Sequence, residues 1–388
     1  MKPILRFPEF NEKWEYNLFS EVVTNKSKKF NPKSDEIRQD IELDSIEQNT
    51  GRLLNTYISK DFTSQKNKFD NGSVLYSKLR PYLNKYYYAQ ISGVCSSEIW
   101  VLNSLNNQKL SNLFLYFFIQ TNRFSNVANK SAGSKMPRAD WGLVENVRLY
   151  KGSIEEQEKI GNFFRKIDKQ IELEENKLKL LEQQKKGYMQ KIFLQEMRFK
   201  DKNNNRYPDW EIKKLEEIAE FQNGKAHENF VSNTGKFILV NSKFISTESK
   251  VKKYVDKQLT PLEINDIAIV MSDVPNGKAL AKCYLIEKEN VYSLNQRIGR
   301  IFNIKGNSKF LYTQINRNKQ LLKYDNGVGQ TNLKKSEIIG IKIYWPNKEE
   351  QDKIGAFFLK LDSIIDKQST KLELLKHRKK GLLQKMFV

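Results

Sequence analysis

A long segment of this sequence occurs twice. Residues 155–193 recur as residues 349–387, at a constant offset of 194 positions and without a gap, and more than half of the aligned residues are identical. A weaker repeat stands before each intervening stretch, as RFPEFNEKWE from Arg6 and as RYPDWEIKKLEE from Arg206. Because the stretches between these markers show little mutual resemblance, the sequence predicts two unlike domains mounted on a duplicated frame.

Both copies of the long segment have the pattern of a helix. Ser153 with Glu156, and Asn347 with Glu350, have the spacing of a capping box. Glutamates crowd each first turn and lysines each last turn, which complements the helix dipole. Apolar residues recur at spacings of three and four, and each helix would span about 60 Å at 1.5 Å per residue.

The apolar seam is interrupted at equivalent places, by Glu174 and Lys185 in the first copy and by Gln368 and Lys379 in the second. We predict that the two helices pack as an antiparallel coiled coil, with Glu174 near Lys379 and Lys185 near Gln368, so that the polar interruptions meet. A register shifted by one heptad is one alternative. Two separate surface helices, each covering its own domain, are another.

The composition indicates a folded protein with an anionic partner. Lys and Arg number 67 against 46 Asp and Glu, and the net charge of +21 favours a polyanion such as a nucleic acid. With 39 % hydrophobic and 12 % aromatic residues, the chain supports packed cores. The two cysteines lie far apart, and the sequence has neither a signal-like start nor an apolar stretch of about 18 residues. We therefore expect a cytoplasmic protein without membrane spans.

Short β-rich runs and brief helical pieces alternate in both variable stretches. GSVLYSKL from Gly72 and KFILVNSKF from Lys236 are typical of strands, whereas LSNLFLYFFIQTNRF from Leu110 is typical of a buried helix. The predicted fold class is α/β, with two mixed-sheet domains joined by two long helices in a pseudo-twofold repeat. The expected boundaries are 1–151 for the first domain, 152–200 for the first spacer helix, 201–346 for the second domain and 347–388 for the second spacer helix.

Basic and amide-rich loops are the candidate DNA-facing surfaces, because Arg, Lys, Asn and Gln side chains match phosphates and base edges. A solvated structural turn is the alternative for each loop. In the first domain the candidate DNA-binding residues are Lys78, Arg80, Tyr82, Asn84, Lys85, Ser134, Lys135 and Arg138. In the second domain they are Asn223, Lys225, Ser272, Asp273, Asn276, Lys278, Asn295, Gln296, Arg297, Gln330, Asn332 and Lys334.

A search for catalytic motifs gives none. The sequence has no GxxxxGK[ST] phosphate loop, and the absence of any Pro-Pro dipeptide argues against an adenine methyltransferase motif. His227 and His377, the two histidines, have no ligand or triad partner at an informative spacing. PDWEIK from Pro208 is superficially similar to a nuclease signature, but it repeats the Arg6 region, so we interpret it as the start of a domain. We therefore predict a chain without catalytic residues or a bound metal.

Four features resemble the specificity subunit of type I restriction–modification systems. They are the paired EEQxKIGxFF…KKGxxQKxF helices, the twin R[FY]P[ED][FW] segments, the SKLRPYLNK turn and the GQTNLKKSEI segment. The resemblance implies two target-recognition domains on antiparallel spacer helices. It also implies three kinds of partner: double-stranded DNA, two methyltransferase subunits that use S-adenosylmethionine on adenine N6, and two motor-nuclease subunits that use ATP and Mg²⁺.

The residues and the resemblance predict the same function. Two unlike domains on a rigid frame can read two half-sites, so the target should be bipartite, asymmetric and interrupted by a nonspecific gap. The alternative is a nonspecific basic coiled-coil protein, such as a nucleoid protein. A stand-alone nuclease would need an acidic metal-binding cluster. Divergence confined to the variable stretches favours specific recognition.

Overall fold

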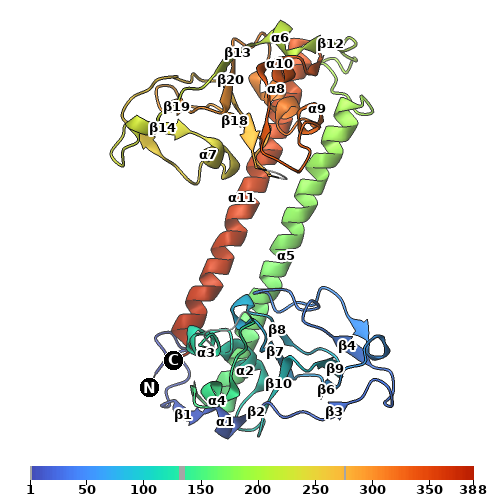
Figure 1. The fold of residues 1–388 in the computed structure, drawn as a ribbon, viewed down its shortest axis with the longest axis vertical. Helices are drawn as coiled ribbons and strands as arrows, with labels where there is room; N and C mark the ends of the chain where they lie inside the picture. Colours follow the sequence, from blue (N-terminus) through green and yellow to red (C-terminus); the bar gives the residue numbers. More distant parts are fainter. Residues whose placement is uncertain (1, 131–135, 275–276) are drawn as a thin grey trace. The chain divides into compact units, whose positions relative to one another are not determined.

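The computed structural model describes residues 2–130, 136–274 and 277–388. The chain forms two compact units, one made of Met1–Lys177 with Ser369–Val388 and the other of Leu178–Gln368. Each unit therefore contains one variable stretch and a part of both long helices (Figure 1). Each also combines parallel and antiparallel strand pairs, so the prediction of α/β domains with mixed sheets is confirmed.

In the first unit, two larger sheets stand beside a small strand pair. The pair consists of β1 (Glu15–Leu18) and β11 (Arg148–Lys151). The four-stranded sheet has the order β2 (Val23–Thr24), β10 (Ile99–Ser104), β7 (Val74–Ser77), β8 (Tyr86–Tyr88). The five-stranded sheet has the order β3 (Lys29–Phe30), β6 (Lys66–Phe69), β9 (Gly93–Ser96), β4 (Gln39–Ile41), β5 (Tyr57–Ile58). Helices α1 (Phe19–Val22), α2 (Asn112–Phe118), α3 (Asn122–Ala128) and α4 (Trp141–Val144) complete the unit. Its core is strongly aromatic, with Phe19, Tyr76 and Phe124 in ring contact.

The second unit follows a similar plan. Its sheets have the orders β12 (Glu211–Lys214), β22 (Lys342–Trp345); β13 (Glu220–Asn223), β20 (Ile298–Phe302), β16 (Ile267–Val270), β18 (Cys283–Leu285); β15 (Tyr254–Val255), β14 (Phe237–Val240), β19 (Tyr292–Leu294); and β17 (Ser272–Asp273), β21 (Thr331–Asn332). Its short helices are α6 (Leu215–Ile218), α7 (Ser242–Ser246), α8 (Ser308–Ile315), α9 (Lys319–Leu322) and α10 (Lys335–Ile339). Aliphatic side chains form most of its core.

Two local predictions need correction. The run from Lys236 is a strand only as far as Val240, because the Asn241 side chain accepts the Phe244 N–H at 2.9 Å and so caps helix α7. The run predicted as one helix from Leu110 is two helices, α2 and α3. The break lies at Thr121, whose backbone is extended and whose hydroxyl donates to the carbonyl of Phe118 at 2.7 Å.

The two long helices are α5 (Ile154–Phe193) and α11 (Lys348–Met386). The predicted caps form in part. The Glu156 N–H donates to Ser153 Oγ at 3.4 Å, and the Glu350 N–H donates to Asn347 Oδ1 at 2.9 Å. Both glutamate side chains are buried and bond to the start of the preceding domain, so each carboxylate has a tertiary partner.

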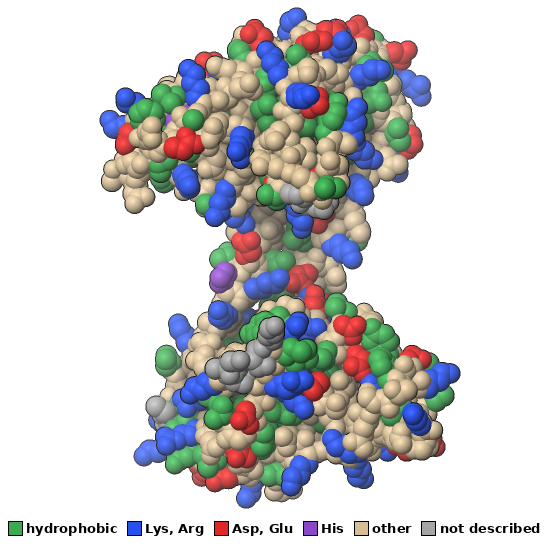
Figure 2. All heavy atoms as spheres, viewed as in Figure 1, with side chains coloured by type: hydrophobic (Ala, Val, Ile, Leu, Met, Phe, Trp, Pro, Cys, Tyr) green, Lys and Arg blue, Asp and Glu red, His purple; other side chains and the backbone are tan. Residues whose placement is uncertain are grey.

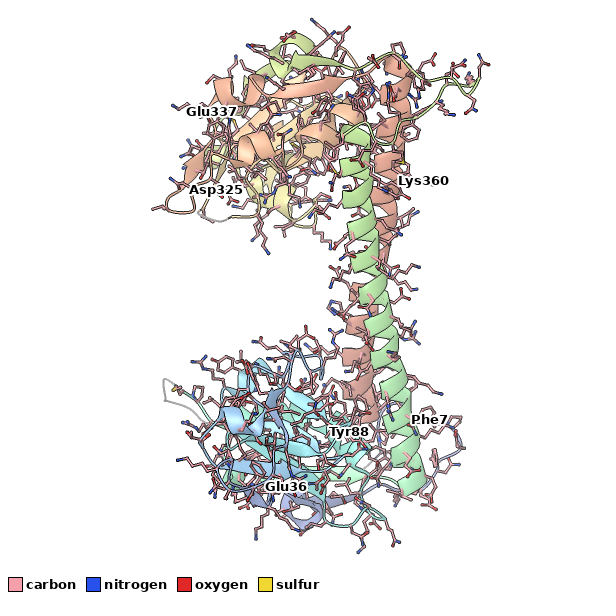
Figure 3. All side chains as sticks on the ribbon, turned by 90° about the vertical axis from the view of Figure 1, so that its right-hand side faces the viewer. Phe7, Glu36, Tyr88, Asp325, Glu337 and Lys360 are labelled. Atoms are coloured by element: carbon pink, nitrogen blue, oxygen red, sulfur yellow. The ribbon has the colours of Figure 1, made fainter. Side chains whose placement is uncertain are left out.

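In the first unit this tertiary partner is the segment before β1. The Glu156 carboxylate accepts from Arg6 Nε at 2.6 Å and from Trp14 Nε1 at 2.9 Å. The Phe7 ring packs edge-on against Phe163 of α5, with centroids 5.7 Å apart (Figure 3). Helix α5 is thereby joined to the first strand of its own domain.

In the second unit the same contacts recur at the start of α11. The Glu350 carboxylate accepts from Arg198 Nη2 at 2.7 Å and from Trp210 Nε1 at 2.8 Å. The Phe199 ring packs on Phe357 with centroids 5.8 Å apart. The counterpart of Arg6 is therefore Arg198.

The predicted alignment of Arg6 with Arg206 is thus wrong. Arg6 and Arg198 bind equivalent glutamates, and Trp14 corresponds to Trp210. The second copy has four more residues between its arginine and its tryptophan. The helix contacts therefore match Arg6 to Arg198, whereas the equivalent lysines Lys159 and Lys353 lie over the rings of Phe7 and Tyr207 and so relate the RFP and RYP segments.

Within the first unit, α5 and α11 contact each other in antiparallel directions. Asp168 Oδ1 lies 2.6 Å from Lys379 Nζ, and Glu174 forms an ion pair with Lys371. The predicted pairing of Glu174 with Lys379 is therefore wrong, because the partner of Glu174 lies eight residues earlier on α11.

Within the second unit the helices are also antiparallel. Lys185 forms an ion pair with Asp362, and the Tyr188 ring packs on Phe357 with centroids 5.2 Å apart. Lys185 thus faces a residue six positions before the predicted Gln368. The observed register differs from the predicted one by about a heptad in both units. In the observed register both seam lysines have a carboxylate partner, whereas the predicted register set Lys185 opposite the neutral Gln368.

Candidate nucleic-acid interface

The turn between β7 and β8 is held in an unusual backbone conformation. Arg80 and Asn84 flank the short 3-10 helix Pro81–Leu83, and both are left-handed, with φ of 51° and 48°. The Arg80 N–H donates to the carbonyl of Pro137 at 2.8 Å, which fixes the turn from outside. Left-handed backbone at residues other than glycine is costly and often marks a functional turn.

The structure brings this turn together with the second predicted loop of the first domain. Leu79 and Arg138 form a β-bridge, and the Ala139 N–H donates to the carbonyl of Lys78 at 2.7 Å. Arg138 also forms an ion pair with Glu98 at 3.0 Å. Ser134 and Lys135 lie outside the described residues.

The candidates in this cluster differ in how far their side chains are engaged. The Asn84 amide donates to Asn49 Oδ1 at 3.0 Å, and the Lys85 ammonium donates to a backbone carbonyl. Within the described part of the chain, no hydrogen bond or ion pair engages the side chains of Lys78, Arg80 or Tyr82, and Tyr82 is 55 % exposed. These three are the residues most available to a ligand.

Four separate loops of the second domain also converge. Lys225 and Asn295 form a parallel β-bridge, and the Met271 N–H donates to the carbonyl of Arg297 at 3.0 Å. Strands β17 and β21 place Ser272 opposite Asn332. The predicted segments around Lys225, Ser272, Arg297 and Asn332 therefore form one continuous surface, although they lie far apart in the sequence.

Some of these candidates hold the loops in shape. Ser272 is buried and accepts from Gln330 Nε2 at 2.6 Å. The Asp273 carboxylate accepts the N–H groups of Ala279 and Leu280 at 2.7 and 3.1 Å, and Gln296 donates to Glu228. Asn276 lies outside the described residues. The candidates with exposed side chains are Asn223, Lys225, Lys278, Gln296, Arg297, Gln330, Asn332 and Lys334.

The sequence reasoning missed the acidic and amide residues around these loops. Glu98 and Glu228 accept from Arg138 and Gln296, and Asn49 holds Asn84. A search for basic and amide clusters has no signal for such partners, because each comes from another part of the chain. Figure 2 shows Lys and Arg side chains spread over both units with carboxylates among them.

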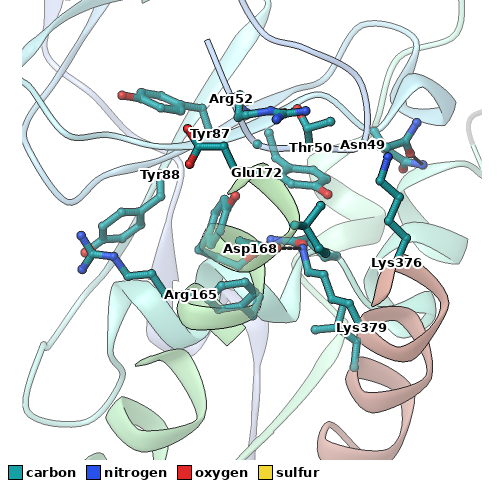
Figure 4. A pocket seen from close by; sticks show the side chains of 18 of the residues that line it. Asn49, Thr50, Arg52, Tyr87, Tyr88, Arg165, Asp168, Glu172, Lys376 and Lys379 are labelled. Atoms are coloured by element: carbon teal, nitrogen blue, oxygen red, sulfur yellow. Dashed lines mark hydrogen bonds and ion pairs between the residues drawn. The ribbon is translucent and has the colours of Figure 1, made fainter. Parts of the chain in front are cut away.

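A pocket of about 930 Å³ lies behind the turn, within the first unit (Figure 4). Loop residues near Asn49 and Arg52, tyrosines of β8 and α2, and faces of α5 and α11 line it. Arg52 forms ion pairs with Glu47 and Glu175, and Lys376 also reaches Glu175. The Asn49 N–H donates to the carbonyl of Asn84, so the loop is joined to both the turn and helix α5.

The floor of this pocket is buried and charged. Burial raises the pKa of Asp168, although the ion pair with Lys379 opposes this shift. Burial also raises the pKa of Tyr86 and Tyr116, so both phenols stay protonated. Most of the charged side chains that line this pocket pair with one another, and these pairs link the Arg52 loop to α5 and α5 to α11.

Across residues 2–130, 136–274 and 277–388, no group of three or more His, Cys, Asp and Glu side chains could hold a metal ion. No described helix is both long and apolar enough to cross a membrane. Cys95 and Cys283 are buried free thiols.

Comparison with solved structures shows the fold. The S subunit of a type I restriction–modification system from M. genitalium has a TM-score of 0.63 at 17 % identity, covering 100 % of this chain and 99 % of that chain. A structure that describes complex assembly and conformational transition of the type I R-M system has a TM-score of 0.59 at 14 % identity, covering 97 % and 98 %.

Comparison with curated sequences shows the relatives. The chain is 26 % identical over 311 residues to the type I restriction enzyme MjaVIII specificity subunit of Methanocaldococcus jannaschii, covering 75 % of this chain and 72 % of the relative. It is 28 % identical over 156 residues to the EcoDI specificity subunit of Escherichia coli, covering 39 % and 34 %. The family model for the type I restriction modification DNA specificity domain matches residues 11–183 and 207–377. The chain therefore belongs to the type I restriction modification DNA specificity family.

Proposed function

We propose that this chain is the sequence-specific DNA-recognition subunit of a type I restriction–modification complex. Each unit reads one half of a bipartite, asymmetric target, and the bases between the halves are not read. The observation that supports this most directly is that two loop clusters of different sequence occupy equivalent places in the two units, where the Leu79–Arg138 bridge of one matches the Ser272–Asn332 pair of the other.

Affinity and base choice come from different residues. The net charge of +21 supplies phosphate contacts, which position the protein and make binding salt-dependent. Exposed arginines and amides of the two clusters select bases, because Arg can form two hydrogen bonds with guanine and Asn or Gln can form two with adenine. A nonspecific binder would gain nothing from two divergent clusters.

The chemistry belongs to partners. Two methyltransferase subunits methylate adenine N6 with S-adenosylmethionine, and two motor-nuclease subunits use ATP and Mg²⁺, while this chain contributes no catalytic residue. Free thiols at Cys95 and Cys283 support a reducing, cytoplasmic setting. The long helices set the distance between the half-sites.

Methylome sequencing tests this proposal. A host that expresses this chain with its methyltransferase partner should methylate adenines in a two-part motif with a fixed gap, and a host with the methyltransferase alone should not. Methylation in one uninterrupted motif, or without any sequence preference, would contradict the proposal.

A further inference from the structure

We infer that His227 is a positioning residue for the base-reading surface of the second domain, an inference that rests on the proposed function. His227 is 1 % exposed, although it belongs to a polar loop between β13 and the next 3-10 turn. Because its ring is buried, His227 cannot contact DNA directly. It acts by holding the loop that carries Lys225, next to Asn223 at the end of β13.

Both ring nitrogens of His227 have partners. Nδ1 lies 2.7 Å from the carbonyl oxygen of Lys225, and Nε2 lies 2.8 Å from Ser293 Oγ. Because a carbonyl only accepts, Nδ1 bears the proton, and in the neutral ring Nε2 accepts from the Ser293 hydroxyl. One side chain therefore joins the Lys225 loop to strand β19.

Ser293 is itself held in place. It is fully buried, its Oγ lies 3.4 Å from the Thr260 N–H, and the neighbouring Leu294 N–H donates to the carbonyl of Thr260 at 2.9 Å. Two residues after Ser293 comes Asn295, followed by Gln296 and Arg297. His227 is thus linked to the buried strand that leads directly into those three candidates.

The loop is also pressed closely against this segment. A Cβ atom at Gly224 would lie 2.0 Å from the carbonyl oxygen of Asn295, so only glycine allows this approach. The Lys225 N–H donates to the carbonyl of Leu294 at 3.3 Å. The Gly224 N–H also donates to the carbonyl of Ile298 at 3.0 Å, and His227 adds a side-chain link from the Lys225 carbonyl to Ser293 of strand β19.

The alternative is that His227 only stabilises the fold. A purely structural residue would affect both half-sites together, through the amount of folded complex. A positioning residue changes the discrimination at the second half-site and leaves the first half-site as an internal control. The two roles therefore predict different methylation patterns.

The test uses the complete complex of this chain with its methyltransferase partner. His227→Phe keeps a ring but removes both hydrogen bonds, Ser293→Ala removes one, and His227→Asn keeps a donor for Lys225. Methylation rates are measured on DNA with the full target and on DNA with one substituted base pair in either half. His377→Phe, on an exposed face of α11, is the matched control.

We expect His227→Phe to lower discrimination at the second half-site by about tenfold, with the first half-site unchanged. Ser293→Ala should show a smaller loss and His227→Asn a partial rescue. Equal loss at both halves, or a second half-site read as in the unaltered chain, would overturn the inference. If the unaltered complex reads no two-part target, the proposed function itself fails; if it does and the variants change nothing, only the role of His227 fails.

Discussion

Lys379 Nζ lies 2.6 Å from Asp168 Oδ1 in the first unit, and Lys185 forms the same ion pair with Asp362 in the second. Each pair joins α5 to α11, and the paired residues are related by the 194-residue offset of the repeat. In the first unit the side chains are 12 % and 26 % exposed, so solvent screens this pair less than a surface pair. Lys185 and Lys379, which interrupt the apolar seams, therefore fix the register of α5 against α11.

Charge reversal tests this register. Asp168→Lys places two cations together and should lower the free energy of unfolding by about 1 kcal/mol or more. Adding Lys379→Asp restores an opposite-charge pair, so the double variant should be more stable than Asp168→Lys alone in urea denaturation. Lys380→Asp, on the next residue of α11, should give no such rescue. A double variant no more stable than either single variant would show that the pair does not set the register.

The ion pairs of Glu175 in the pocket should make the stability of the first unit depend on pH. Burial tends to raise the pKa of Glu175, but its ion pairs with Lys376 and Arg52 outweigh burial and lower that pKa below its ordinary 4.5. Because this pKa is lower in the folded state than in the unfolded state, the Glu175 carboxylate stabilises the fold above pH 4.5. That stabilisation is lost as the pH falls through the lowered pKa of Glu175 in the folded protein.

Arg52→Gln should therefore reduce the drop in melting temperature on acidification, because Glu175 loses one of its two cations. The measurement is a series of thermal melts between pH 7 and pH 3, with Arg165→Gln, on the same pocket wall, as the control. A pH profile identical to that of the unaltered chain would exclude this contribution.

Arg80→Ala should relax one half of the target. The side chain is exposed on a turn whose backbone is fixed by Pro137, so its loss leaves the turn in place. Discrimination at one base pair should fall by about tenfold. Arg297→Ala should do the same for the other half. Equal losses at both halves for either variant would indicate a folding defect and not a base contact.

Arg198→Ala should destabilise the second unit, whereas Arg206→Ala should not. Arg198 pairs with Glu350, which is 0 % exposed, and removing one partner of a buried pair costs about 3 kcal/mol. Arg206 is exposed and serves as the matched control. Similar stabilities for the two variants in urea denaturation would refute the equivalence of Arg198 with Arg6.

Lengthening both long helices should lengthen the unread gap. Inserting four residues, about one helical turn, into α5 and into α11 keeps both loop clusters unchanged. Methylome sequencing should then return the same two half-sites with a longer gap. A gap of the original length would refute the role of the helices as spacers.

The sequence alone predicts those features that depend on local pattern. The long helices, their N-caps and the strands β7 and β14 follow from repeat, spacing and β-propensity. The ion pair of Asp168 with Lys379 was missed, because Asp168 lies off the apolar seam. The equivalence of Arg198 with Arg6 was missed too, since only their contacts with Glu350 and Glu156 identify it.

In the candidate site too, the sequence identifies features of local pattern but not those that depend on tertiary contacts. Residue type and loop composition identify Arg80 and Arg297 as candidates, and they remain predictions for base contact. Sequence reasoning could not show that the Met271 and Arg297 segments adjoin, because that depends on pairing between distant strands. Nor could it separate Asp273, whose carboxylate holds its own loop, from an exposed neighbour such as Lys278.

The contacts of Glu156 and Glu350 also bear on how such a protein can change over time. Each glutamate binds an arginine and a tryptophan from the segment that begins its domain, and none of these residues belongs to the loop clusters. Mutations in the loops can therefore accumulate, or a whole recognition domain can be exchanged between relatives, while the attachment to the helices is inherited intact. A lineage can thus acquire a new target sequence without rebuilding the two long helices.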